Sequence, residues 1–258
     1  MKPLAPDIGV VDGPFEYFAV AGVRMPIPFT TRMTVVRLAD GGLFLHSPIA
    51  FDEKLAAELT RIGPVRHLVS PNQWHYAHVG EWQRAFPEAI VWGSHAAERR
   101  ARARHIPVRF TRYLEPAPPS EWSGEIEQAV MPGGIFGETI FFHRSSASLI
   151  LTDTIINLER SKVDQPWFGV ARLTGMTAPG GGLFFGLRLP LLFRRRRPSP
   201  PSAPGVRAGS SSPTAGSSRT ARRRLWSGFS GERSLSWVQG TNPCPTAPAL
   251  CFRLVDGA

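Results

Sequence analysis

The sequence lacks cysteine through its first 243 residues and lacks any long apolar run. Its two cysteines, Cys244 and Cys251, lie near the C-terminus, so the body of the chain holds neither a disulfide nor a cysteine-based zinc site. No apolar stretch reaches the roughly 18 to 20 residues that cross a bilayer, and the N-terminus has no continuous apolar segment typical of a signal peptide. These absences predict a cytoplasmic protein with no membrane partner.

Acidic residues are scarce beyond residue 180. Residues 181–258 hold 12 arginines and 2 acidic residues, whereas residues 1–180 balance 18 basic with 18 acidic residues. The net charge of +10 therefore belongs to the C-terminal part, where the composition also changes to Pro, Ser, Gly and Arg. This predicts a folded domain over residues 1–180 and a disordered tail over 181–258. Nucleic acid is not an expected partner of the neutral domain.

The tail has two further explanations. It can be a basic arm that binds nucleic acid, or it can be the product of a changed reading frame in a GC-rich gene. If the reading frame begins one base upstream, DNA that encodes residues 212–216 can be translated as Leu-Ala-His-Gly-Arg. The same shift over residues 222–230 permits an alanine-rich helix. We hypothesise a frameshift that begins between residues 194 and 212 and leaves the C-terminal part of the fold incomplete.

Hydrophobic periodicity predicts a mixed α/β order of elements. The first feature is a β-hairpin over residues 33–46, with a tight turn at Asp40-Gly41-Gly42. Apolar residues at helical spacing and flanking Gly or Pro then predict helices over 52–62, 80–86 and 96–104. The remaining apolar segments predict strands over 65–69, 89–92, 126–131, 139–142 and 148–152.

The segment from Gln73 to Gly80 follows a predicted strand and precedes a predicted helix. It carries His75 and His78, which a loop can bring to one centre, as metal binding requires. The segment resembles the H-x-H-x-D-H-x-G motif of the metallo-β-lactamase superfamily, in which such side chains hold one or two metals and activate a water. His75, His78 and Gly80 match the motif, whereas Gln73 replaces the first His and Ala77 replaces the Asp.

Two later segments are similar to motifs of the same superfamily and occur in the same order. Residues 132–138 resemble its P-G-H-T-P-G-S loop, with Gly134 in place of a ligand His. Residues 149–154 resemble the strand end whose Asp bridges two metals, and Asp153 keeps that residue. The resemblance implies an α/β fold, a metallo-β-lactamase-like αββα sandwich, and identifies the chain with a branch whose metal motif is degenerate.

The resemblance implies that His75, His78 and Asp153 are the metal ligands, for one Zn or Fe ion or for none. In the binuclear arrangement the two histidines belong to different metals, so the surviving ligands are divided between two half-sites. Replacement ligands are available, and we consider His46, His95 and His143.

Structural roles remain alternatives for every candidate. His75 and His78 can be hydrogen-bonded structural residues, and Asp153 can cap a turn through backbone N–H groups. We expect Glu138 to be a surface strand residue, and we expect His46 and His143 to be half-buried with satisfied imidazoles. The arginine-rich stretch 99–104 is expected to be a solvated helix face.

Three functions follow from these observations. The first is a metal-dependent hydrolase that acts on an unknown small molecule at a degraded mononuclear site. The second is a non-catalytic relative that keeps the fold as a small-molecule or protein-binding module. The third, a nucleic-acid binder, requires that the basic tail is genuine.

Overall fold

The computed structural model describes residues 1–20, 23–134, 137–158, 160, 167–173, 175–177, 181–183, 237–238 and 252–255. Seven strands of this part form one sheet in the order β1-β2-β3-β4-β5-β6-β7. β1 to β4 run antiparallel to their neighbours, and β4 to β7 run parallel. The strands of this first sheet are β1 (Lys2–Ala5), β2 (Ile8–Val20), β3 (Val23–Arg37), β4 (Leu43–His46), β5 (Val65–Val69), β6 (Ile90–Gly93) and β7 (Arg112–Tyr113).

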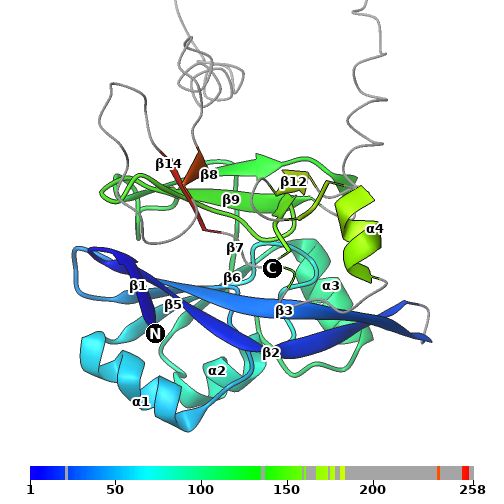
Figure 1. The fold of residues 1–258 in the computed structure, drawn as a ribbon. Helices are drawn as coiled ribbons and strands as arrows, with labels where there is room; N and C mark the ends of the chain where they lie inside the picture. Colours follow the sequence, from blue (N-terminus) through cyan, green and yellow to red (C-terminus); the bar gives the residue numbers. More distant parts are fainter. Residues whose placement is uncertain are drawn as a thin grey trace, which may run out of the picture.

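A second sheet faces the first, as Figure 1 shows, and helices α1 and α2 lie on the far side of the first sheet. The strand order of the second sheet is β13-β14-β10-β9-β8, and β11 pairs separately with β12. Its strands are β8 (Ile126–Met131), β9 (Glu138–His143), β10 (Ser148–Ile150), β13 (Trp237–Val238) and β14 (Phe252–Val255), and the small pair is β11 (Ile155–Ile156) and β12 (Gly182–Leu183). The described helices are α1 (Glu53–Ile62), α2 (Val79–Ala85), α3 (His95–Ala103) and α4 (Trp167–Leu173).

The first sheet is buried on both faces because its side chains alternate between two hydrophobic cores. In β4, Leu43 and Leu45 pack with residues of α1, α2 and α3, whereas Phe44 packs into the core between the sheets. In that inter-sheet core the ring of Trp122 lies 5.1 Å from Phe44 and 4.6 Å from Trp92. The predicted α/β sandwich of two sheets with helices outside the first is therefore confirmed.

The three predicted helices correspond to α1, α2 and α3, with ends that agree within one residue, whereas α4 was not predicted. The side chain of Asp52 accepts a hydrogen bond from the N–H of Leu55 and caps α1, and that of Ser94 caps α3 through Ala97. The predicted hairpin corresponds to the antiparallel pair β3 and β4, and the other predicted strands correspond to β5, β6, β8, β9 and β10.

The N-terminal strands were not predicted. β2 and β3 form a long hairpin with irregular register between Asp12 and Phe15 and between Tyr17 and Ala19. Its strands contain Pro14, Pro26 and Pro28, and proline removes a ladder hydrogen bond and weakens the strand pattern in the sequence. The prediction of a first strand near residue 33 is therefore wrong, and the chain forms β1, β2 and two thirds of β3 before that point.

Most of the predicted tail, residues 181–258, lies outside the described residues. Within the described ones, β14 (Phe252–Val255) pairs in parallel with β10. The short strand β13 (Trp237–Val238) pairs in parallel with β14. The frameshift and the domain boundary near residue 180 stay predictions. Across the same described ranges, no helix is long and apolar enough to cross a membrane.

His46 at the end of β4 is completely buried, which corrects the expectation of a half-buried, satisfied imidazole. Its ring meets Phe141 edge-on at 5.3 Å, and neither ring nitrogen has a hydrogen-bond partner among the described residues. Burial, and secondarily the charge of His75, lowers the pKa of His46 to about 3. His46 therefore stays neutral in the folded protein at pH values where an unfolded histidine is protonated.

We predict that His46→Leu reduces the loss of stability on acidification. The unfolded state takes up a proton below about pH 6.5 while folded His46 does not, so each pH unit between about 6.5 and 3 costs the native protein about 1.4 kcal/mol. Urea unfolding at pH 7.5, 6 and 5 measures this slope, and His105→Asn, which removes an exposed imidazole, provides the control. Equal slopes for the native chain and His46→Leu would contradict the prediction.

Candidate functional site

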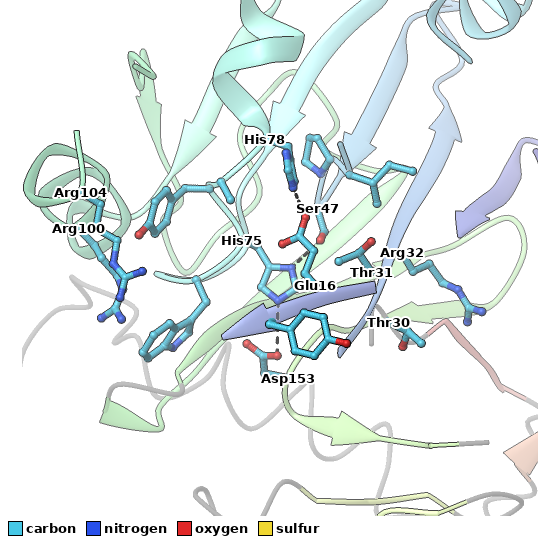
Figure 2. A pocket seen from close by; sticks show the side chains of 16 residues that line it. Glu16, Thr30, Thr31, Arg32, Ser47, His75, His78, Arg100, Arg104 and Asp153 are labelled. Carbon is cyan, nitrogen blue, oxygen red and sulfur yellow. Dashed lines mark hydrogen bonds and ion pairs between the residues drawn. The ribbon is translucent and has the colours of Figure 1, made fainter. Parts of the chain in front are cut away.

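A pocket of about 180 Å³ opens at the carboxyl ends of the parallel strands of the first sheet. Ser47 follows β4, the loop with His75 and His78 follows β5, and α3 follows β6, so these segments meet at one edge. Figure 2 shows the side chains that line the pocket. They are Glu16, Tyr17, Thr30, Thr31, Arg32, Ser47, Pro48, Ile49, Trp74, His75, Tyr76, Ala77, His78, Arg100, Arg104 and Asp153.

Asn72 shapes the loop that carries the two histidines. Its side-chain oxygen accepts hydrogen bonds from the backbone N–H of Trp74 at 2.7 Å and of His75 at 3.1 Å. Its amide nitrogen donates to Asp153 Oδ2 at 2.7 Å and to the Thr152 hydroxyl at 3.0 Å. Because Asn72 is buried and fully engaged, it fixes the His75 loop to the end of β10.

His75 connects Ser47 to Asp153. Its Nδ1 lies 2.6 Å from Ser47 Oγ, and its Nε2 lies 3.4 Å from Asp153 Oδ1. Figure 2 shows the three side chains in a row, joined by dashed lines. Burial favours the neutral imidazole, but the charge of Asp153, the hydrogen bond with it and the charges of Glu138 and Glu16 together raise the pKa of His75. In the tautomer that carries its proton on Nε2, His75 donates a hydrogen bond to Asp153. Its Nδ1 then accepts a hydrogen bond from the hydroxyl group of Ser47.

Glu138 holds the turn that presents Asp153. Its carboxylate accepts hydrogen bonds from the backbone N–H of Thr152 at 3.1 Å, Asp153 at 3.0 Å and Thr154 at 2.9 Å, and also from the Thr152 hydroxyl. Burial, followed by the charge of Asp153, raises the pKa of Glu138. Glu138 is 2% exposed, so its expected surface position is wrong.

The same contacts bear on the turn-capping role considered for Asp153. The backbone N–H groups of the turn are taken by Glu138, so the carboxylate of Asp153 points to Asn72 and His75. Glu138 of β9, and not Asp153, therefore holds the turn, and Asp153 lies beside His75.

His78 belongs to a separate cluster of charges. Its Nε2 makes a short contact with Glu16 Oε1, and its Nδ1 lies 3.3 Å from Glu81 Oε2. The hydrogen bond with Glu16 is the main cause that raises the pKa of His78, and the same bond lowers the pKa of Glu16. Both shifts favour an ion pair. Glu16 comes from β2, so the sequence analysis missed it together with that strand.

The predicted ligands do not converge on a metal. His75 contacts Asp153, whereas His78 contacts Glu16 and Glu81, and both nitrogens of each imidazole face a hydrogen-bonding partner. Within the described ranges, no group of three or more His, Cys, Asp or Glu side chains is placed to hold a metal ion. The residues in this arrangement do not fit a three-ligand centre, and the ligand roles of His75, His78 and Asp153 stay predictions.

The replacement ligands considered from the sequence do not line the pocket. His46 lies in the inter-sheet core, and the ring of His95 stacks against Tyr113 at 3.8 Å. His143 is buried at the end of β9, where its ring nitrogens lie 2.7 Å from Ser146 Oγ and 3.2 Å from Ser145 Oγ. The expectation that His143 is half-buried is wrong, although its hydrogen bonds are satisfied as expected.

The arginine-rich helix contributes to the pocket. Arg100 and Arg104 line it, and the guanidinium carbon of Arg100 lies 3.5 Å from the centre of the Trp74 ring. Stacking on an aromatic face orients the Arg100 guanidinium and supplies a cation–π attraction. The expectation of a solvated face over residues 99–104 is therefore wrong for Arg100, which is partly buried, and holds for Arg104, which is exposed at the pocket rim.

The fold and the pocket together define an α/β sandwich with a site at the carboxyl ends of its parallel strands. The chain belongs to the family described as Domain of unknown function (DUF4336), which matches residues 17–166. That range contains β3 to β11 and every pocket residue named above except Glu16.

Several solved structures are similar to this chain. One is TMB-1, with a TM-score of 0.47, 16% identity and coverage of 72% of this chain and 91% of that one. A metallo-β-lactamase from Hirschia baltica has a TM-score of 0.45 and 14% identity, with coverage of 60% of this chain and 71% of that one. A metallo-β-lactamase from Pontibacter korlensis has a TM-score of 0.44 and 14% identity, with coverage of 76% of this chain and 98% of that one. At these identities and scores the likeness assigns no activity to this chain. No curated protein matches the sequence.

We predict that Glu138→Ala lowers the free energy of unfolding by about 2 to 4 kcal/mol, because it leaves buried N–H groups and the Thr152 hydroxyl without an acceptor. Glu127→Ala is the matched control, since Glu127 is a partly exposed glutamate that pairs with Arg144. Its expected cost is below about 1 kcal/mol. Chemical denaturation measures both values, and equal costs would argue against the structural role of Glu138.

Proposed function

We propose that this protein is a hydrolase that acts on a small molecule in the pocket, with His75 as its general base. The observation that supports this is the alignment of Asp153, His75 and Ser47 at the pocket wall. A general base must lie within about 2.6 to 3.2 Å of the atom that carries the proton it removes, and the 2.6 Å separation of His75 Nδ1 and Ser47 Oγ meets that condition.

The chemistry follows from the two nitrogens of His75. Asp153 accepts a hydrogen bond from Nε2–H, which leaves Nδ1 unprotonated. Nδ1 can then deprotonate a hydroxyl group or a water in the pocket as that group attacks an electrophilic carbonyl carbon, and Asp153 stabilises the imidazolium that forms. Asn72 holds the other oxygen of Asp153, so it acts as a positioning residue for the base.

The His78–Glu16 pair gives the pocket a second polar group with a different role. The pKa of His78 is raised, mainly by its hydrogen bond with Glu16, which favours the cationic imidazole. Because Glu16 and Glu81 take both of its ring nitrogens, His78 holds the pocket wall and has no N–H left for a substrate oxygen. The guanidinium of Arg100, which lines the pocket against the Trp74 ring, is a cation that can stabilise negative charge on that oxygen.

We predict that His75→Ala lowers kcat/KM for an activated ester such as p-nitrophenyl acetate by roughly 100- to 10,000-fold, the range that a positioned general base supplies. His95→Ala is the matched control, because His95 stacks on Tyr113 and does not line the pocket. Steady-state absorbance assays measure both variants. Turnover that survives His75→Ala would refute the proposed base, whereas the absence of turnover in the native chain would favour the binding-module alternative.

Metal content tests the hydrolase mechanism implied by the sequence resemblance. Because the described side chains do not converge, we predict well below one metal ion per chain in the purified full-length protein, before and after chelation. Elemental analysis beside the His75→Ala, His78→Ala double variant measures this. One ion per chain that disappears in the double variant would contradict our mechanism and support the metal-dependent one.

A further inference from the structure

Ser47 occupies an unusual place in the pocket wall. It follows the last residue of β4 directly, and its φ of 56° lies in the left-handed region that residues other than glycine seldom adopt. Its N–H donates to the carbonyl of Val69 at 2.8 Å, which fixes this conformation to the end of the neighbouring strand. Ser47 is 5% exposed, yet it lines the pocket, so its hydroxyl is held in one place beside the cavity.

The contacts of this hydroxyl are those of an activated nucleophile. Ser47 Oγ lies 2.6 Å from His75 Nδ1, and the opposite nitrogen of the ring faces Asp153 at 3.4 Å. The three residues come from positions far apart in the sequence, and such a constellation is recognised by its geometry and not by its order along the chain. The turn held by Glu138 and the side chain of Asn72 keep the acid in place.

We infer that Ser47 is the nucleophile of a Ser47–His75–Asp153 triad that hydrolyses small carboxylic esters through a covalent acyl-serine intermediate. This inference rests on the proposed hydrolase function and adds to it the nucleophile and the substrate class. An alternative role for the hydroxyl is to anchor the His75 ring alone, with a water as the attacking group.

The reaction has two steps, acylation of Ser47 and hydrolysis of the acyl-serine. In the first, Ser47 Oγ bonds to the carbonyl carbon, its proton passes to His75 Nδ1, the bond from the carbonyl carbon to the alkoxy oxygen breaks, and the alcohol leaves with that proton. In the second, a water attacks the acyl carbon, gives a proton to His75, and the bond to Ser47 Oγ breaks as that proton returns to it. The sum is ester plus water to acid plus alcohol, without an oxidant or reductant.

The attack of Ser47 places a negative charge on the carbonyl oxygen of the ester. In many serine hydrolases the backbone N–H of the residue after the nucleophile donates a hydrogen bond to this oxyanion, but Ser47 is followed by a proline. Pro48 has no N–H, so another group at the pocket wall must supply that charge stabilisation. Both ring nitrogens of His78 face carboxylates, those of Glu16 and Glu81, so its charge is neutralised within that cluster. Arg100 lines the same pocket, and its guanidinium, held against the Trp74 ring, supplies the positive charge for this role.

The test is covalent labelling of the full-length protein with a small fluorophosphonate, followed by intact mass and peptide mapping. We expect one adduct per chain, on Ser47, and no adduct in Ser47→Ala or Ser47→Gly. The glycine variant suits the left-handed φ and keeps the test valid if the alanine variant folds poorly. Ser146→Ala is the matched control, because Ser146 Oγ lies 2.7 Å from His143 Nδ1 but outside the pocket, and it should label normally.

Ester hydrolysis by the same variants separates the two proposals. We expect Ser47→Gly to lower kcat/KM by about 1,000-fold or more, as loss of a triad nucleophile does. Hydrolysis that depends on His75 but survives in Ser47→Gly, with no adduct on Ser47, would overturn the covalent mechanism and leave the proposed hydrolase intact. The absence of both hydrolysis and labelling in the folded native chain would overturn both, and an adduct on another residue would overturn the assignment of Ser47.

Discussion

Three consecutive backbone N–H groups after β10 donate to one buried carboxylate, that of Glu138. Burying a carboxylate costs several kcal/mol unless hydrogen bonds compensate, and here the turn supplies them together with the Thr152 hydroxyl. The turn cannot relax without leaving donors unpaired in the interior. It therefore directs Asp153 to the His75 loop, and the orientation of His75 depends on that placement.

The same region connects the two sheets. Asn72, in the loop after β5, forms an isolated bridge with Glu138, and the N–H of Thr139 donates to the carbonyl of Pro71 at 2.8 Å. The loop and the turn thus belong to different sheets and meet at the edge of the pocket, which His75 and Asp153 both line. A site built on the ends of packed strands is held more rigidly than one on free loops, which suits a base that must lie within hydrogen-bond reach of its proton donor.

Part of the candidate site could be predicted from the sequence. The order of elements, the loop with His75 and His78, and Asp153 at a strand end follow from periodicity and from a motif. Ser47, Glu16 and Glu138 could not be assigned in this way: a serine after a short strand is common, Glu16 lies in a strand interrupted by Pro14, and a glutamate at a strand start is usually exposed. One signal for Glu138 was available, since it follows the glycine-rich loop that resembles a ligand loop.

The sequence by itself indicated the sandwich through its resemblance to a known superfamily, and the consecutive apolar residues Leu43, Phe44 and Leu45 fit a strand that packs on both faces. It also indicated that His75, His78 and Asp153 follow strands, but the parallel pairing of β4 to β7, which brings the ends of these strands together, came from the tertiary structure. Only the tertiary structure decided how the charges pair: His75 with Asp153 and Ser47, and His78 with Glu16 and Glu81. Those pairings join residues up to 78 positions apart, and hydrogen bonds of 2.6 to 3.4 Å depend on packing distances that local patterns do not encode.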